Sequence, residues 1–252
     1  MKYIRIIPRL DIKGPNLVKG IHLEGLRVLG KPESFARLYY EQGADEIIYQ
    51  DTVASLYQRN NLTEIVTRTA ENIFIPITLG GGIKSLKDID SALNSGADKI
   101  AINTAAVKNP NLIEDLSKKF GSQSIVLSVE AKKKDKGNWE VYTENGRQET
   151  GLDVIKWTKI ATEKGVGEIL LTSVDMEGTK KGFDFDLIKK VSNNVNVPII
   201  ASGGFGKPND MLKAHLDCSA DAVAIADAFH FKRVKIEDLR RIAFDNNFNL
   251  RK

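Results

Sequence analysis

The sequence has little of what disulfides and metal sites are built from. Cys218 is its single cysteine, which excludes an intrachain disulfide and any CxxC metal motif. Its three histidines, His22, His215 and His230, have no spacing typical of metal ligands, and no GxSxG serine-nucleophile motif is present. We therefore expect no metal and no cofactor, and the cytoplasm is the default location for a chain with so little cysteine.

Long apolar runs and strong net charge are lacking too. No stretch approaches the roughly 18 apolar residues that a membrane helix needs, and "MKYIRIIPRLDIKG" is interrupted too early for a signal peptide. The net charge is only +4, and the one basic run, "AKKKDKG" at 131–137, is interpreted as a solvated loop rather than a nucleic-acid site. The sequence therefore predicts a soluble globular protein without membrane or nucleic-acid partners.

Eight short segments are apolar throughout, which is typical of strands covered on both faces. They are 3–10, 45–50, 74–79, 98–103, 124–130, 167–173, 197–202 and 221–226. Stretches with helical spacing lie between them, for example 32–43, 108–121 and 152–165. This alternation predicts an α/β fold, a single (β/α)₈ TIM barrel, with an open doubly wound sheet as the alternative. Because no linker rich in Pro, Gly or Ser interrupts the chain, we expect one domain over 1–252.

The chain also repeats itself. "PITLGGGIK" (76–84) recurs as "PIIASGGFGK" (198–207), and "GADEIIYQD" (43–51) recurs as "GVGEILLTSVD" (165–175). The offset from Gly43 to Gly165 equals that from Gly81 to Gly203. Self-similarity at a fixed period indicates repeat architecture, so we expect two half-barrels, approximately 1–121 and 122–252.

Glycines and polar residues follow equivalent strands in the two halves. Glycine lets backbone N–H groups approach a ligand, and such groups at a helix start can bind an anion. The residues are Gly81, Gly82, Asn103 and Thr104 on one side, and Gly203, Gly204 and Asp227 on the other. Two such sites on opposite sides of the barrel mouth predict a long ligand with a phosphate at each end. The alternative is that the glycines only make tight turns.

Two acids occupy corresponding places in the repeat. Asp11 ends the first strand and Glu130 ends the fifth, so we expect them to face each other across the mouth. Paired carboxylates suit acid–base catalysis, because burial and mutual repulsion separate their pKa values. Solvated loop acids are the alternative. Asp51 and Asp175, after the second and sixth strands, are weaker candidates that also fit a role as helix caps.

Several motifs resemble one family closely. They are "RLDIKGPNLVKG" (9–20), "TLGGGI" (78–83), "ADKIAINTAAVKNP" (97–110), "GEILLTSVDMEGTKKGFD" (167–184) and "IIASGGFGK" (199–207). With them, the chain resembles the cyclase subunits of imidazole glycerol phosphate synthase nearly end to end. A related isomerase of histidine biosynthesis shares the half-barrel plan, but "FGSQSIVLSVEAK" and "AFHF" favour the cyclase.

This resemblance implies a reaction and roles for residues. In the family, ammonia from a glutaminase partner attacks a bisphosphorylated ribulosyl aminoimidazole carboxamide, closes an imidazole and releases an aminoimidazole carboxamide ribotide. Asp11 and Glu130 then correspond to the acid–base pair, Lys19 lies in a mobile loop that closes over substrate, and Thr172 binds substrate.

The resemblance also implies an ammonia entrance at the bottom of the barrel. A ring of charged residues at the strand starts guards this entrance in the family. The corresponding residues here are Arg5, Glu46, Lys99 and Glu168. Two positive and two negative charges can neutralise one another, which makes a buried ring tolerable.

The chain departs from the family at several of these positions. Glu130 and Glu177 replace aspartates, Arg9 replaces a small residue, and Asp227 replaces a hydroxyl residue; "KGPN" replaces the usual Asp-Gly of the first loop. By strand alternation Arg9 points into the barrel, where we expect it to lower nearby carboxylate pKa values and to crowd the ammonia path. Asp227 is expected to repel a phosphate.

These departures leave two alternatives open. One is a paralogue that uses glutaminase-derived ammonia to convert an acetamido group of a sugar to an acetamidino group in bacterial surface-glycan synthesis. The other is a non-catalytic scaffold that conducts ammonia to a separate enzyme. The presence of Asp11 and Lys19 argues against the scaffold.

Overall fold

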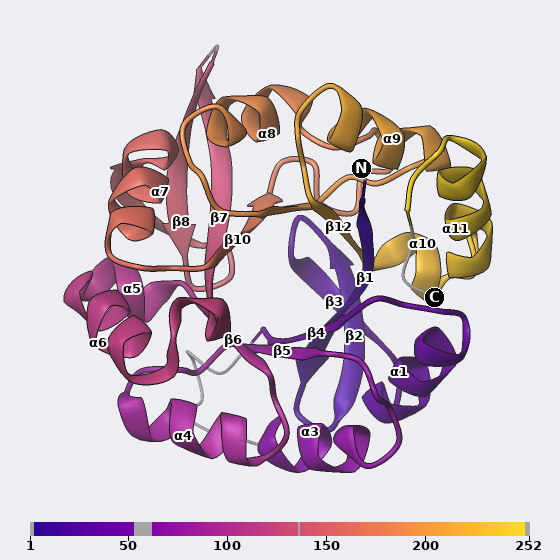
Figure 1. Cartoon of the computed structure of the whole chain (residues 1–252), viewed down its shortest axis with the longest axis horizontal. Helices are drawn as coiled ribbons and strands as arrows, with labels where there is room; N and C mark the ends of the chain where they lie inside the picture. The colour runs from indigo at the N-terminus through magenta and orange to yellow at the C-terminus, as the bar shows by residue number, and fades with distance from the viewer. Residues whose placement is uncertain (1–2, 53–61, 136, 250–252) are drawn as a thin grey trace.

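In the computed structural model, which describes residues 3–52, 62–135 and 137–249, eight parallel strands close into a barrel surrounded by helices (Figure 1). The barrel strands are β1 (Arg5–Lys13), β4 (Ile47–Asp51), β5 (Ile77–Gly80), β6 (Lys99–Ile102), β7 (Ile125–Asp135), β10 (Glu168–Ser173), β11 (Ile199–Ser202) and β12 (Ala222–Ile225). The barrel closes because β1 pairs in parallel with both β12 and β4, while β7 pairs with both β6 and β10. The predicted (β/α)₈ fold is confirmed, and the open-sheet alternative is wrong.

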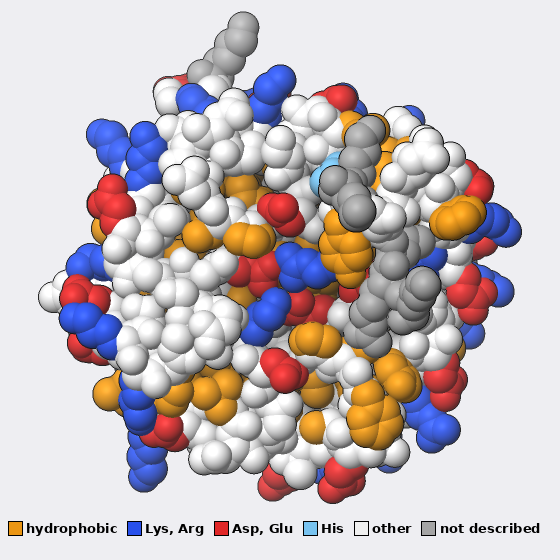
Figure 2. All heavy atoms as spheres, viewed as in Figure 1, with side chains coloured by type: hydrophobic (Ala, Val, Ile, Leu, Met, Phe, Trp, Pro, Cys, Tyr) orange, Lys and Arg blue, Asp and Glu red, His pale blue; other side chains and the backbone are white. Residues whose placement is uncertain are grey.

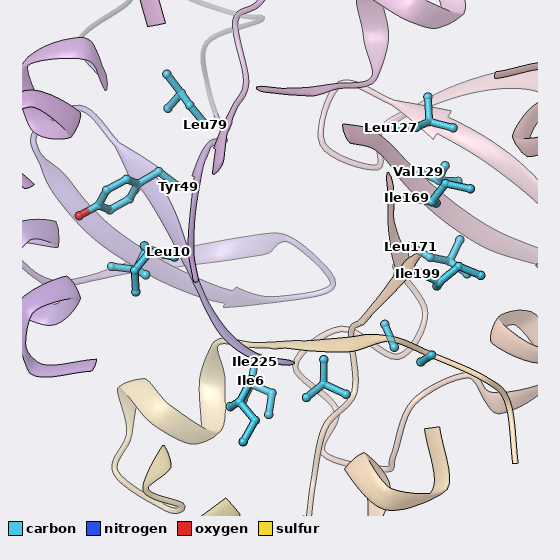
Figure 3. Packing of buried hydrophobic residues seen from close by; sticks show 14 of the residues in the cluster. Ile6, Leu10, Tyr49, Leu79, Leu127, Val129, Ile169, Leu171, Ile199 and Ile225 are labelled. Carbon is cyan, nitrogen blue, oxygen red and sulfur yellow. The ribbon is translucent and has the colours of Figure 1, made fainter. Parts of the chain in front are cut away.

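The helices lie outside the barrel and cover the outer face of its strands. They are α1 (Pro32–Glu41), α3 (Leu62–Ala70), α4 (Leu86–Asn94), α5 (Thr104–Lys108), α6 (Asn111–Phe120), α7 (Val154–Glu163), α8 (Phe185–Ser192), α9 (Pro208–Leu216), α10 (Asp227–His230) and α11 (Ile236–Asp245), with a 3₁₀ turn at Ser122–Ser124. Outward-facing side chains such as Leu10, Tyr49 and Ile169 point from the strands toward the helices (Figure 3). Among the described residues, no helix is both long enough and apolar enough to span a membrane.

Two hairpins were missed by the sequence analysis. β1 continues beyond the barrel and pairs antiparallel with β2 (Asn16–Ile21), which pairs with β3 (Glu24–Gly30). β7 likewise continues into β8 (Asn138–Thr143) and β9 (Gln148–Asp153). The basic run 131–137 was wrongly predicted to be a loop, because its residues up to Asp135 extend β7 and pair with β8. Both hairpins follow the first strand of a predicted half-barrel; the division near residue 121 itself stays a prediction.

The barrel interior is layered. Along β1 the inward positions are Arg5, Ile7, Arg9 and Asp11, because successive side chains of a strand alternate between faces. Around Ile7 lies an apolar layer that consists of Ile7, Ile48, Ala101, Val126, Leu170, Ile200, Ala222 and Ala224. This layer separates charged residues at the strand starts from charged residues at the strand ends, so that polar chemistry is confined to the two ends of the barrel.

Candidate active site

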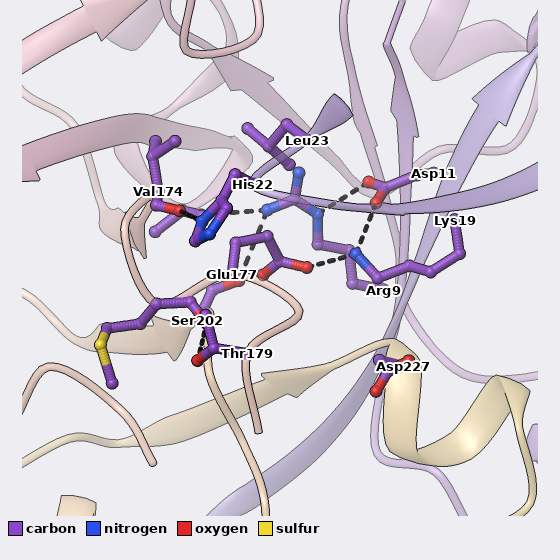
Figure 4. Close-up of polar contacts among 12 residues, drawn as sticks. Arg9, Asp11, Lys19, His22, Leu23, Val174, Glu177, Thr179, Ser202 and Asp227 are labelled. Carbon is purple, nitrogen blue, oxygen red and sulfur yellow. Dashed lines mark hydrogen bonds and ion pairs between the residues drawn. The ribbon is translucent and has the colours of Figure 1, made fainter. Parts of the chain in front are cut away.

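Asp11 forms a buried ion pair with Arg9 at the mouth of the barrel. The Arg9 Nε atom donates to Asp11 Oδ1 over 2.9 Å (Figure 4). Arg9 Nη1 donates to Thr172 Oγ1 over 3.0 Å. Asp11 is 2% exposed and Arg9 is 4% exposed. Burial raises the pKa of Asp11, but the charges of Arg9 and Lys19 outweigh burial and hold that pKa below its ordinary value. Asp11 is therefore an anion at neutral pH.

Lys19 lies in strand β2, rather than in the open loop expected from the sequence. Its ammonium group forms a salt bridge with Glu177 and lies 3.7 Å from Asp11 Oδ2 (Figure 4). Burial lowers the pKa of Lys19, but Glu177 and Asp11 outweigh it and raise the pKa above its usual value. The hairpin is also held by the backbone N–H of His22, which donates to the Glu177 carbonyl over 3.0 Å. In this arrangement, β2 brings a cation directly to the acid of β1.

Glu130, at the end of the barrel part of β7, has a very different environment. Its Oε2 atom accepts hydrogen bonds from Gly146 N over 2.8 Å and from Asn103 Nδ2 over 3.1 Å. Burial raises the pKa of Glu130 to about 7, against opposing effects of the Gly146 hydrogen bond and the Arg9 charge. Arg9 therefore lowers the pKa of both carboxylates, as expected, but at Glu130 the effect of burial is larger and the net shift is upward. The two acids differ in charge near neutral pH.

A cavity of about 350 Å³ opens beside Glu130 on the side of the first glycine pair. Gly81 and Gly82 have φ values of 93° and 73°, which glycine adopts without strain, and both line the cavity together with Asn103 and Thr104. Asn103 Nδ2 is engaged by Glu130 Oε2 and by the carbonyl of Tyr142, and so its amide nitrogen is already used by the protein. This side of the mouth has room for a ligand group.

The opposite side of the mouth is nearly filled. The pocket lined by Gly203, Gly204 and Asp227 has a volume of about 20 Å³. A Cβ atom at Gly204 would clash with the carbonyl of Gly182. Chain packing is therefore sufficient to explain a glycine at this position. The Asp227 carboxylate forms a salt bridge with Arg233, a partner that the sequence analysis missed. The two predicted phosphate sites are therefore unequal in space and in charge.

The four charged residues at the strand starts meet in a closed ring. Glu46 Oε2 lies 3.1 Å from Arg5 Nη1 and 2.9 Å from Lys99 Nζ. Glu168 bonds to Arg5 as well, and its Oε2 atom lies 2.8 Å from Lys99 Nζ. Figure 2 looks onto this end of the molecule and shows Lys or Arg and Asp or Glu side chains gathered in a hollow at its centre. Each cation therefore contacts both carboxylates, and the charges balance within the ring.

Asp51 and Asp175 are the two further candidates from the sequence. Asp175 Oδ2 accepts a hydrogen bond from the backbone N–H of Lys133 over 2.7 Å, which ties it to the β7 extension. Asp51 lines the larger cavity next to Gly81. Among the described residues, no group of three or more His, Cys, Asp or Glu is arranged to hold a metal ion. Gly146 and Glu177 were not selected from the sequence as site residues, because their contacts depend on the hairpins.

The chain is similar to one family over most of its length. The model of the histidine biosynthesis protein family matches residues 5–235. An imidazole glycerol phosphate synthase subunit HisF of Legionella pneumophila is 63% identical over 207 residues, which are 82% of this chain and 98% of that protein. The HisF subunits of Wolinella succinogenes and Methanocaldococcus jannaschii are 48% and 45% identical, over 94% and 98% of this chain and 93% and 98% of theirs.

Proposed function

Since the chain belongs to the histidine biosynthesis protein family, among the imidazole glycerol phosphate synthase subunits HisF, we propose that it closes an imidazole ring with ammonia from a glutaminase partner. The chain is an enzyme, the cyclase subunit of such a synthase. The observation that supports the chemistry best is the difference between Asp11, whose pKa is lowered, and Glu130, whose pKa is about 7. One carboxylate and one carboxylic acid are then available at the same pH.

The two acids match the proton movements of the reaction. When ammonia attacks a carbonyl carbon, the nitrogen must lose protons and the carbonyl oxygen must gain them before it leaves as water. Asp11, as an anion, accepts a proton from the nitrogen, and Glu130, when protonated, donates one to the oxygen. Lys19 lies close enough to Asp11 to stabilise its charge before and after the transfer. The cavity beside Gly81 and Gly82 receives one phosphate end of the substrate.

Ammonia reaches the acids from the opposite end of the barrel in this proposal. The relatives are subunits of a synthase, which implies a partner subunit. We place a glutaminase over the ring of Arg5, Glu46, Lys99 and Glu168, because the hollow of about 530 Å³ at this end is lined by three of them. The apolar layer above the ring favours neutral ammonia over ammonium, since burying an isolated charge costs far more than burying a small polar molecule.

Turnover of the bisphosphorylated ribulosyl aminoimidazole carboxamide with ammonium salts tests the proposal directly. We expect imidazole glycerol phosphate and the aminoimidazole carboxamide ribotide in equal amounts from the chain alone, and glutamine-dependent turnover when a glutaminase subunit is added. Absence of both products, from a folded chain with ammonium in excess, would contradict the cyclase activity.

The Asp227–Arg233 pair favours a second candidate function. A ligand with phosphate at one end only, such as an acetamido nucleotide-sugar, avoids the carboxylate at the small pocket. We therefore propose amidination of such a sugar as the alternative activity, with the same ammonia route. The assay replaces the bisphosphate by an acetamido nucleotide-sugar and follows the acetamidino product by mass spectrometry. Turnover of neither substrate, combined with intact transfer of ammonia to another enzyme, would instead support the non-catalytic scaffold.

A further inference from the structure

Arg9 spans most of the barrel cross-section. It starts on β1, and its Nη1 atom reaches Thr172 Oγ1 on β10 over 3.0 Å and Ser202 Oγ on β11 over 3.4 Å. Around the barrel, β10 is separated from β1 by β11 and β12. The guanidinium therefore lies across the barrel axis, directly above the apolar layer that contains Ile7.

The Nη1 atom of the Arg9 guanidinium is held by two hydroxyl groups, and its Nε atom faces Asp11. Thr172 is fully buried and Ser202 is 4% exposed, so that the two hydroxyl groups hold Nη1 in a fixed place. The planar group then presents Nε to Asp11 Oδ1 at 2.9 Å. Because an arginine side chain remains protonated in proteins and its donors form a rigid fork, its orientation determines where the carboxylate lies.

Other titratable groups surround Asp11, but none of them donates a hydrogen bond to its carboxylate in the described part of the chain. They are Lys19 on β2, Glu177 after β10, Glu130 on β7 and His230 on α10. Lys19 stays 3.7 Å from Asp11 because it bonds to Glu177. Burial lowers the pKa of His230 to about 4, so this ring is uncharged at neutral pH. Among the described residues, Arg9 is therefore the cation in direct hydrogen-bond contact with Asp11.

We propose that Arg9 is a positioning residue for Asp11: anchored on Thr172 and Ser202, it fixes where the Asp11 carboxylate lies and keeps it charged. The inference rests on the proposed function in one respect, namely that Asp11 takes part in the reaction. A role in stability alone does not explain Arg9, because a buried ion pair is often no more stabilising than apolar residues of similar volume. The apolar layer below would accept such a residue.

The experiment compares Arg9→Met, which removes the charge, with Arg9→Lys, which keeps the charge but lacks the fork. The carboxyl titration of Asp11 is followed by NMR in protein labelled with ¹³C at the Asp side chains, with Asp11→Asn to assign the signal. We expect Arg9→Met to move the Asp11 titration to higher pH and Arg9→Lys to leave it nearly in place. Arg37→Met, which removes an exposed arginine that pairs with Glu41, is the control and should change nothing.

Turnover with ammonium salts supplies the second readout. We expect kcat to fall about tenfold or more in both Arg9 variants at pH 7, because a misplaced reacting group loses rate even when its charge is kept. In Arg9→Met the acidic limb of the pH–rate profile should also move to higher pH, since Asp11 must be ionised to act. If Arg9→Met does not fold, the kcat of Arg9→Lys decides: a fall of about tenfold supports the proposal, and a wild-type kcat contradicts it.

Two results would overturn the proposal. One is an Asp11 titration that is the same in the wild type and in Arg9→Met. The other is an Arg9 variant, Arg9→Lys included, with wild-type or higher kcat and an unmoved acidic limb, which would make Arg9 a mere obstruction on the axis. If the wild type has no turnover on the bisphosphate, the proposed function fails, but the NMR titration still tests the coupling of Arg9 to Asp11.

Discussion

The Nδ2 atom of Asn103 donates a hydrogen bond to Glu130 Oε2 over 3.1 Å, and the same nitrogen donates to the Tyr142 carbonyl over 3.0 Å. Two acceptors on one side of the amide determine its orientation, so that Asn103 Oδ1 must point away from them. Within the described part of the chain this oxygen is buried and has no hydrogen-bond partner. Asn103 therefore holds Glu130 and offers an acceptor, rather than the donor that a phosphate site requires.

Replacing Asp11 by Asn should abolish product formation. We expect turnover to fall by roughly 10²–10⁴-fold, the usual contribution of a positioned acid or base. The variant should still fold, with a lower melting temperature, because Arg9 loses its charged partner in a buried place. Turnover with ammonium salts and circular dichroism check the two effects. The double variant Asp11→Asn/Arg9→Met is the control for stability, because it removes the unpaired Arg9 charge as well. Near-normal turnover in Asp11→Asn would show that Asp11 takes no part in the reaction.

Glu130 should destabilise the protein above neutral pH. Its pKa is about 7 in the folded state, above the ordinary value of 4.5, so the folded state binds a proton that the unfolded state has released. Stability is therefore lost as pH rises from about 4.5 to 7, by about 3 kcal/mol in total. Glu130→Gln, which cannot ionise, should be more stable than the wild type at pH 8 and similar at pH 4.5. Urea unfolding at several pH values measures this, and a pH-independent difference would contradict the raised pKa.

Anions should occupy the larger cavity first. The cavity beside Gly81 holds about 350 Å³, whereas the pocket beside Gly203 holds about 20 Å³ and carries the Asp227 carboxylate. We expect phosphate or sulfate in soaked crystals at the Gly81 side, with little or none at the Gly203 side. Asp227→Ser should raise phosphate affinity at the small pocket about tenfold, because it removes a repulsive charge and frees Arg233. Equal occupancy in the wild type would show that Asp227 does not exclude a second phosphate.

Removing one cation from the charged ring should uncouple glutamine hydrolysis in the partner subunit from product formation in this chain. Lys99→Met removes one of the two cations that contact both Glu46 and Glu168, and leaves Arg5 alone to neutralise these two carboxylates. In the complex with a glutaminase, we expect more than one glutamine hydrolysed per product, while turnover with added ammonium stays near normal. Lys119→Met, which breaks an exposed pair with Asp90, is the matched control. An unchanged ratio of hydrolysis to product would place the ammonia entrance elsewhere.

Much of the fold follows from local patterns in the sequence. The eight apolar segments became strands because each is short, buried on both faces and ended by turn residues. The ring of Arg5, Glu46, Lys99 and Glu168 was assigned from the family resemblance, and each residue lies at or directly before the start of a barrel strand. The hairpins were harder to predict, because "AKKKDKG" is polar and its strand is stabilised by pairing with β8 rather than by burial.

The sequence by itself determined the barrel, and it placed Asp11 and Glu130 where the barrel parts of β1 and β7 end, although both strands continue beyond them. These features depend on periodicity and on order along the chain. Only the tertiary structure decided the charge state of Glu130 and the ion-pair partners of Lys19 and Asp227. Lys19 meets Glu177, and Asp227 meets Arg233, through contacts that no local pattern encodes. The pKa of Glu130 reaches about 7 because the closed barrel buries its carboxyl group, and this burial outweighs the hydrogen bond from Gly146 N, which lowers the pKa. Burial of this kind exists only after strands far apart in sequence have come together.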